Sequence, residues 1–331
     1  MRRVVDIYPS DFLTLREVGL RDGLQMVKQF PSSAVKTEWL TREAAAGVRH
    51  FEVGSFLPAN RMPQFSDVCE MIDFCTRLGV HSAALALNDR GAEEAVRTQV
   101  GEIVNVVSAT EEHSQTNMRR SREAAIGLVS KTVRLARDSD TPPLVQAGIA
   151  MAFGCSITGV VEPNEVVRLS VACAEAGADL IGLADTVGFA GPDQVANLTN
   201  RLVKELGEVP VSVHLHDTRG MGIANASAAL DAGAAILDGS LGGLGGCPFA
   251  PGATGNVVFE DLVFLAERKG FSTGIDLEKL VAVREIITNE MPDEPLYGAF
   301  ARAGAPPFMP WRAKTQKQEN QINREEPNEY T

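Results

Sequence analysis

Two histidines separated by one residue, His214 and His216, stand near the end of the apolar stretch VSVHLHD at 211–217. Side chains two apart on a β-strand point to the same face, so both imidazoles would point together and Leu215 would point away. Imidazoles that converge in this way can share a divalent metal. Two unrelated histidines, one of them a hydrogen-bonded core residue, are the alternative, and their common register favours the metal site.

Oxygen donors for such a site stand elsewhere in the chain, at Asp22 in GLRDG and at Asn256. A nitrogen and oxygen donor set without thiolate suits Mg²⁺ or Mn²⁺, with Co²⁺ or Zn²⁺ as substitutes. Arg21 places a cation beside Asp22, where it could hold an oxyanion while Asp22 holds the metal. The alternative interpretation of this motif is an ion pair in a surface loop.

A glycine-rich stretch, GGLGGCPFAPGATGN at 242–256, surrounds Cys247. Glycine permits unusual backbone angles and close approach to a ligand, and such a segment beside an active site can close over it. The alternative is a structural turn around a buried cysteine.

The elements that must position these residues are strands alternating with stretches of helical length. We predict eight strands, at 13–19, 50–56, 81–87, 102–109, 145–153, 180–186, 211–217 and 234–240. Strands that alternate with helices are typical of parallel sheets with right-handed crossovers. Eight units predict an α/β fold of the (β/α)8 TIM-barrel type over residues 1–290, and a doubly wound open sheet is the rival.

The barrel is expected to carry a C-terminal extension in two parts. Residues 291–314 mix aromatics with prolines and should pack on the barrel or on a neighbouring subunit. Residues 315–331 are polar and almost free of apolar side chains, so we expect a disordered tail.

A barrel enzyme carries its chemistry at the C-terminal ends of its strands. Charged and metal-competent side chains gather at those predicted ends: Glu17, Arg21, Asp22, Gln25, Glu52, Asp185, His214, His216 and Asn256. The sequence therefore predicts an active site at one rim. The motifs of P-loop ATPases, Rossmann dehydrogenases and α/β-hydrolases are missing.

The overall composition argues against several other roles. With 31 basic and 43 acidic residues among 331, the net charge of −12 disfavours nucleic-acid binding. No apolar run reaches the roughly 18 residues of a membrane span, and no secretory signal is evident. Five irregularly spaced cysteines indicate a reducing, cytoplasmic location.

Four stretches, EVGLRDGLQ, FEVGSF, HLHDTRGMGIAN and GGLGGCPFAPGATGN, closely resemble the 3-hydroxy-3-methylglutaryl-CoA lyase family, over roughly residues 10–285. The resemblance implies a metal-dependent barrel that cleaves an acyl-CoA by a retro-Claisen reaction, and it suggests a homodimer. The arginine–aspartate and histidine motifs are shared with related synthases, whereas the loop around Cys247 is not. A synthase or aldolase of the same barrel group, and a catalytically silent scaffold, are therefore the weaker alternatives.

The resemblance also implies roles for individual residues. Asp22, His214, His216 and Asn256 look like the metal ligands, and the metal would orient the substrate and acidify its tertiary hydroxyl. Asp185 or His214 would take the hydroxyl proton, and Glu52 resembles another acidic residue that matters for the chemistry. Arg21 would stabilise the enolate oxygen, Cys247 would protonate the carbanion, and Glu17 and Gln25 would position the ligands and Arg21.

Three stretches depart from the family pattern, GLADT at 182–186, SFLPANRMPQ at 55–64 and AFGCSITG at 152–159. The metal and catalytic set is intact, and the first two of these stretches should face the substrate. The expected reaction is cleavage of 3-hydroxy-3-methylglutaryl-CoA to acetyl-CoA and acetoacetate. The alternative is a related substrate such as citramalyl-CoA, which would yield acetyl-CoA and pyruvate.

Overall fold

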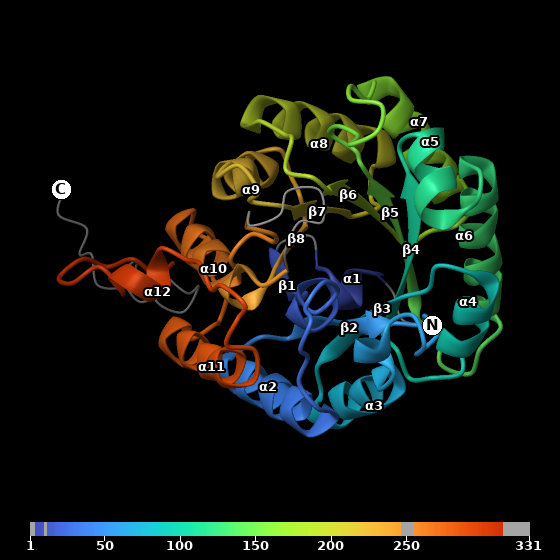
Figure 1. Ribbon diagram of the computed structural model, residues 1–331. Coiled ribbons are helices and arrows are strands. Elements are labelled where there is room, and N and C mark those ends of the chain that lie inside the picture. Colours follow the sequence, from blue (N-terminus) through green and yellow to red (C-terminus); the bar gives the residue numbers. More distant parts are fainter. Residues whose placement is uncertain (1–3, 10–11, 246–253, 314–331) are drawn as a thin grey trace, which may run out of the picture.

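A closed barrel of eight parallel strands forms the centre of the computed structural model, which describes residues 4–9, 12–245 and 254–313 (Figure 1). The strands are β1 (Thr14–Glu17), β2 (His50–Ser55), β3 (His81–Leu85), β4 (Glu102–Ser108), β5 (Leu144–Ala150), β6 (Leu180–Asp185), β7 (Val211–Leu215) and β8 (Ile236–Gly239). The predicted TIM barrel is confirmed, and each strand falls inside its predicted segment, except that β5 begins one residue before it.

The barrel is closed, which excludes the alternative prediction of a doubly wound open sheet. β1 pairs in parallel with β8, with Arg16 opposite Asp238 and Glu17 opposite Gly239. The strands are rich in Val, Ile, Leu and Ala because they are buried on both faces, against the barrel interior and against the helices.

Helices surround the barrel in chain order, as Figure 1 shows. They are α2 (Ser33–Ala46), α3 (Val68–Leu78), α4 (Asp89–Ala95), α5 (Glu111–His113), α6 (Arg122–Arg137), α7 (Pro163–Glu175), α8 (Pro192–Leu206), α9 (Gly222–Asp231), α10 (Phe259–Arg268) and α11 (Leu277–Glu290). Four short turns interrupt the loops: η1 (Gly19–Gly23), η2 (Pro63–Phe65), η3 (Ser114–Met118) and η4 (Leu241–Gly243). The part of the chain that the structure describes holds no helix long and apolar enough to cross a membrane.

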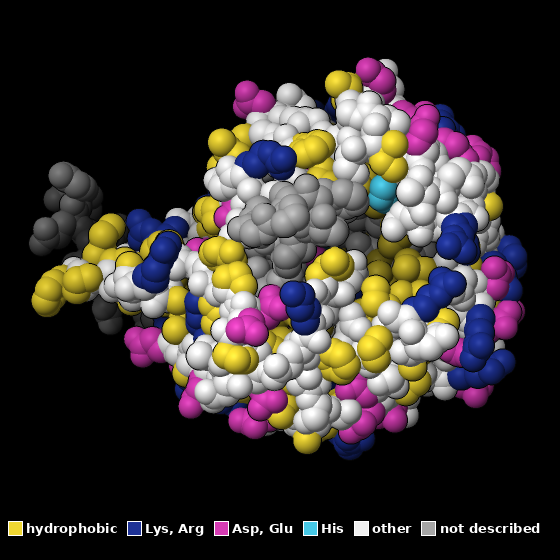
Figure 2. Space-filling model, in the orientation of Figure 1, with side chains coloured by type: hydrophobic (Ala, Val, Ile, Leu, Met, Phe, Trp, Pro, Cys, Tyr) yellow, Lys and Arg dark blue, Asp and Glu magenta, His cyan; other side chains and the backbone are white. Residues whose placement is uncertain are grey.

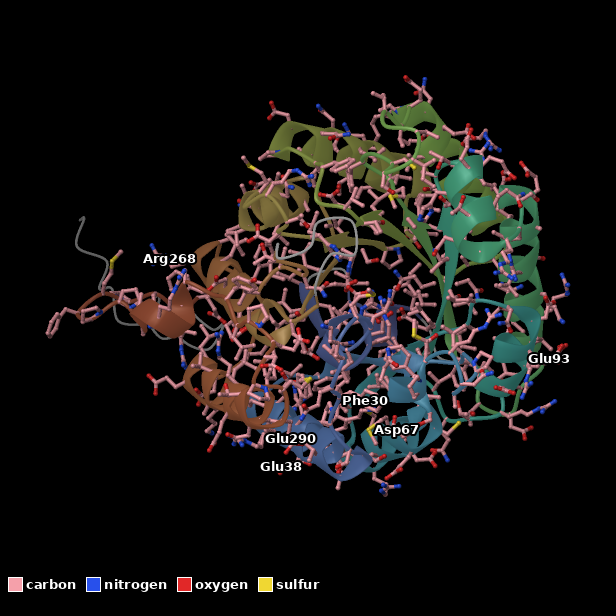
Figure 3. The ribbon with its side chains drawn as sticks, viewed as in Figure 1. Phe30, Glu38, Asp67, Glu93, Arg268 and Glu290 are labelled. Carbon is pink, nitrogen blue, oxygen red and sulfur yellow. The ribbon has the colours of Figure 1, made fainter. Side chains whose placement is uncertain are left out.

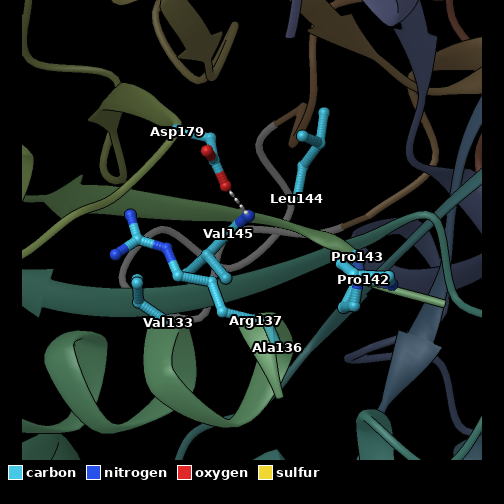
Figure 4. Close-up of a pocket in the computed structure, with 8 residues that line it drawn as sticks. All are labelled: Val133, Ala136, Arg137, Pro142, Pro143, Leu144, Val145 and Asp179. Atoms are coloured by element: carbon cyan, nitrogen blue, oxygen red, sulfur yellow. Dashed lines mark hydrogen bonds between the residues drawn. The ribbon is translucent and has the colours of Figure 1, made fainter. Parts of the chain in front are cut away.

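A short helix that the sequence analysis did not predict, α1 (Val4–Ile7), lies at the end of the barrel where the strands begin. Tyr8, which follows it, packs with Leu144, Leu180 and Ile236 from the starts of three strands. At the same end, Asp179 accepts a hydrogen bond from the Val145 amide at 2.8 Å beside a small hollow (Figure 4). Tyr8 and these strand residues fill this end of the barrel, and the C-terminal ends of the strands form the opposite rim, where barrel enzymes carry their chemistry.

The last described segment leads away from the barrel, and Figure 1 shows α12 (Phe300–Ala303) projecting beside α10. Trp311 lies against Phe264 and Phe300, with ring centroids 5.5 and 5.7 Å apart. Arg268, labelled in Figure 3, donates to the Pro310 carbonyl at 3.2 Å. The division at 290 and 314 stays a prediction, and the predicted tail at 315–331 lies outside the described residues.

Candidate active site

The turn that follows β1 presents Arg21 and Asp22 to the barrel mouth. It is a single π-helical turn, η1, in which the carbonyl of Val18 accepts the amides of residues 21, 22 and 23. Glu17 supports it from outside the barrel, because its Oε1 accepts from the Gly19 amide at 2.9 Å and the Leu241 amide at 3.0 Å. A side chain at Gly19 would lie 2.5 Å from that oxygen, so glycine is required there.

The two histidines meet Asp22 at this mouth. Their ring centroids are 5.1 Å apart, and Leu215 between them is buried toward the helix layer, as strand alternation predicts. Asp22 Oδ2 lies 3.6 Å from His214 Nε2 and 3.3 Å from His216 Nε2. Among the described residues, these three form the one group of His, Cys, Asp and Glu side chains that could hold a metal ion.

Asn256 completes the group from the far side of the glycine-rich stretch. A backbone bridge pairs it with His216, and its Nδ2 donates to Asp22 Oδ2 at 2.9 Å and to the Leu244 carbonyl at 3.1 Å. Its Oδ1 is buried and accepts no hydrogen bond from the described residues. A buried amide oxygen without a hydrogen-bond donor, next to a carboxylate and two imidazoles, fits a divalent cation. A metal would supply the missing partner of that oxygen.

Arg21 joins the acidic residues of the mouth. Its Nε donates to Glu52 Oε2 at 2.5 Å, and its Nη1 contacts Asp22 Oδ1 and donates to Gln25 Oε1 at 3.2 Å. Burial alone would raise the pKa of Asp22, but the Arg21 guanidinium and both histidines hold it well below its ordinary value. Burial does raise the pKa of Glu52, because its contact with Arg21 offsets only part of the desolvation.

Asp185 and Glu17 are buried, and the hydrogen bonds that the structure shows for both go to backbone amides rather than to Asp22, His214, His216 or Asn256 (the Asp22 group). Asp185 closes β6, where its two oxygens accept the amides of Phe189 at 2.9 Å and Ala190 at 3.1 Å, and burial raises its pKa. Burial raises the pKa of Glu17 to about 8. Because the Glu17 carboxyl group accepts hydrogen bonds from the Gly19 and Leu241 amides, it acts on the backbone of the turn and not on the side chains of residues 21 and 22.

Cys247 lies outside the described residues, so its predicted role stays a prediction. The described chain on both sides of it adjoins the site, because a Cβ at Gly245 would lie 2.7 Å from Asn256 Nδ2. Figure 2, in the orientation of Figure 1, shows hydrophobic side chains among charged ones on this face of the molecule.

Asp238 is a residue of the site that the sequence analysis missed. It lies on β8, and its Oδ2 is 3.2 Å from His214 Nδ1. The signal was available as an acidic residue inside the apolar strand AAILDGS. Burial opposes ionisation of Asp238, but Arg16 and His214 hold its pKa down to about 2, so it is a carboxylate that only accepts hydrogen bonds.

The charge state of His214 leads to a prediction about proton release. Burial would lower its pKa, but hydrogen bonds to Asp22 and Asp238 outweigh burial and raise the pKa to about 9. Below that pH the ring is protonated, and a metal must displace the proton from Nε2. We expect each bound Mn²⁺ to release about one proton near neutral pH, and affinity to fall as pH drops.

Calorimetry in buffers of different ionisation enthalpy measures this release, with injections into each buffer alone as controls. A binding enthalpy that does not depend on the buffer would contradict the charged state of His214.

The closed barrel, with convergent imidazoles and a carboxylate at the C-terminal ends of its strands, defines a TIM-barrel enzyme. The HMGL-like family model matches residues 13–287. A hydroxymethylglutaryl-CoA lyase of Bacillus subtilis is 34% identical over 285 residues, covering 86% of this chain and 94% of the relative. An (R)-citramalyl-CoA lyase of Chloroflexus aurantiacus is 35% identical over 304 residues, covering 88% and 95%.

A solved structure shows the same relationship. The HMG-CoA lyase of Acinetobacter baumannii, in complex with coenzyme A and 3-methylmalate, has a TM-score of 0.82 and 32% identity, and the match covers 91% of this chain and 98% of that one. The chain belongs to the HMGL-like family, and it is a carbon–carbon lyase.

Proposed function

We propose that this protein cleaves a 3-hydroxy-3-methyl acyl-CoA in a divalent-metal-dependent retro-Claisen reaction, with 3-hydroxy-3-methylglutaryl-CoA as substrate and acetyl-CoA and acetoacetate as products. The observation that carries the proposal is the convergence of Asp22, His214 and His216 beside Arg21. Mg²⁺ or Mn²⁺ suits these ligands and Asn256, with Co²⁺ or Zn²⁺ as substitutes. When bound, the metal orients the substrate oxygens and makes the tertiary hydroxyl more acidic.

Proton removal from that hydroxyl begins the cleavage. Of the two candidates, Asp185 and His214, we favour Asp185, because His214 has Nδ1 turned to Asp238 and Nε2 turned to Asp22. The raised pKa of Asp185 makes it a stronger base than an ordinary aspartate. The bond between the carbinol carbon and the acetyl methylene then breaks, the hydroxyl carbon becomes the ketone, and the electron pair passes to the thioester enolate.

Arg21 and Cys247 act on that enolate. The guanidinium of Arg21, held at the mouth by Glu52 and Gln25, stabilises the negative oxygen. Cys247 donates a proton to the carbanion carbon, which releases acetyl-CoA. Glu17 contributes by fixing the turn that carries Arg21 and Asp22.

The acyl group of the substrate is the part of this proposal to test first, because a hydroxymethylglutaryl-CoA lyase and an (R)-citramalyl-CoA lyase are about equally similar to this chain. Product analysis tests it. Metal-loaded protein is incubated separately with 3-hydroxy-3-methylglutaryl-CoA and with citramalyl-CoA, each with and without a chelator, and the keto acid is identified. We expect acetoacetate to form faster than pyruvate, and only without chelator.

A His216→Ala preparation treated in the same way is the control for contaminating lyase. Chelator-sensitive pyruvate with little acetoacetate would replace the proposed substrate with citramalyl-CoA. No keto acid from either thioester, despite bound metal, would overturn the function and leave a silent scaffold.

The same proposal places the enzyme in the cytoplasm as a homodimer, without a nucleic-acid or membrane partner. The thiols of Cys69, Cys75, Cys155 and Cys173 are free, as in a reducing compartment, and the excess of acidic residues disfavours polyanions. Light scattering on the purified protein measures the oligomeric state.

A further inference from the structure

A buried arginine occupies the barrel interior directly beneath the Asp22 group. The interior of a TIM barrel is filled mainly by branched apolar side chains, so a buried cation in it is unusual and indicates a specific role. Arg16 on β1 points inward and is 1% exposed. Polar side chains from four other strands surround it: Glu102 from β4, Gln146 from β5, Ser212 from β7 and Asp238 from β8.

The contacts of Arg16 fix it in one orientation. Its Nε donates to Asp238 Oδ1 at 2.9 Å and its Nη2 to Asp238 Oδ2 at 3.1 Å, so the guanidinium grips both oxygens of that carboxylate. Its Nη1 donates to Glu102 Oε1 at 2.8 Å and to Gln146 Oε1 at 2.9 Å. A two-pronged pair of this kind fixes the carboxylate plane as well as its charge.

Asp238 passes this orientation to His214. One of its oxygens, Oδ2, lies 3.2 Å from His214 Nδ1. Since a carboxylate held by a guanidinium accepts hydrogen bonds and donates none, Nδ1 carries the hydrogen and Nε2 faces Asp22. A partner of this kind sets both the tautomer and the ring direction of a metal-binding histidine.

We propose that Arg16 is a positioning residue for the metal centre: by holding both oxygens of Asp238, it keeps the Nε2 lone pair of His214 directed at the metal. The inference rests on the proposed function, because it takes His214 as a ligand. The proposed ligands do not by themselves point to Arg16, because its hydrogen bonds go to Asp238, Glu102 and Gln146.

The test is Mn²⁺ affinity, measured by calorimetry on the full chain without any thioester. Arg16→Met and Asp238→Asn are each expected to weaken binding by roughly 10–100-fold, the usual cost of losing an outer partner of a metal ligand. Arg16→Lys keeps the charge but loses the two-pronged grip, so we expect a partial loss. The double variant Arg16→Met/Asp238→Asn should lose no more than the worse single variant, because both changes break the same link.

Tyr8→Phe is the matched control. It removes the hydrogen bond of 2.5 Å from the tyrosine hydroxyl to Glu102 at the far end of the same buried layer, but leaves the grip on Asp238 intact. Its Mn²⁺ affinity should equal that of the wild type. Circular dichroism establishes that each variant is folded, and Arg16→Lys, which keeps the buried charge, carries the test if Arg16→Met does not fold.

The outcomes separate the two proposals. Wild-type protein that binds no Mn²⁺ would remove the proposed metal site itself. Wild-type protein that binds Mn²⁺, with folded Asp238→Asn and Arg16→Met variants that bind it equally well, would overturn only the role of Arg16. Additive losses in the double variant would show that the two residues act separately, which also overturns it.

Discussion

Replacing His216 with alanine is expected to abolish stoichiometric metal binding and, with it, lyase turnover. The His216 imidazole lies 3.3 Å from Asp22 Oδ2 and is almost fully buried, so its truncation removes one of the two nitrogen donors and leaves a void beside Asp22. The loss should exceed the roughly 10–100-fold that an outer-shell change costs, because a ligand itself is removed. Mn²⁺ calorimetry and metal analysis after gel filtration measure the effect.

His113→Ala is the control for this variant. His113 is also buried, and its Nδ1 lies 2.9 Å from Ser108 Oγ, but it lies outside the ligand group. It should retain one full equivalent of metal. A full equivalent bound to His216→Ala would remove His216 from the ligand set.

Replacing Cys247 with alanine is expected to leave metal affinity unchanged and to lower the cleavage rate by about 10²–10⁴-fold, the range typical of a lost general acid. The proposed proton donor acts after the carbon–carbon bond has broken, so its removal should not affect the Asp22 group. Parallel assays of Mn²⁺ affinity and keto-acid formation separate the two effects.

Cys173→Ala provides the matched comparison. This cysteine is buried in α7, and burial raises the pKa of its thiol to about 12. Turnover of the folded Cys173→Ala protein should stay close to that of the wild type. Near-normal turnover in Cys247→Ala would exclude Cys247 from the mechanism.

The parts of the fold that follow from local patterns could be predicted from the sequence. Alternating strands and helices gave eight parallel strands, because each strand must be buried on both faces and each crossover needs a helix. The convergence of His214 and His216 followed from strand alternation alone. Their meeting with Asp22 followed from the rule that barrel strands end at one rim.

The remainder depends on contacts between distant strands. Arg16 looks like an ordinary polar residue in a short strand, and only the pairing of β1 with β8 places it opposite Asp238. The pairing of Tyr8 with Glu102 spans 94 residues and could not be seen in the local pattern of either. The predicted role of Glu17, to position the metal ligands and Arg21, stays a prediction, and the residue pattern does not reveal that its hydrogen bonds go to the backbone amides of two loops.

The contacts around Asp22 bear on how the protein would acquire the proposed ion. Arg21 neighbours Asp22 on η1, Asn256 arrives from the segment before α10, and both histidines come from the end of β7. These residues come from separate parts of the chain and meet only in the folded barrel, so we expect metal binding to follow folding as a separate event. A metal site that forms before it binds its ion can take up whichever divalent ion is available in exchangeable form. The identity of the bound ion then depends on the metal concentrations in the cell as well as on the fold.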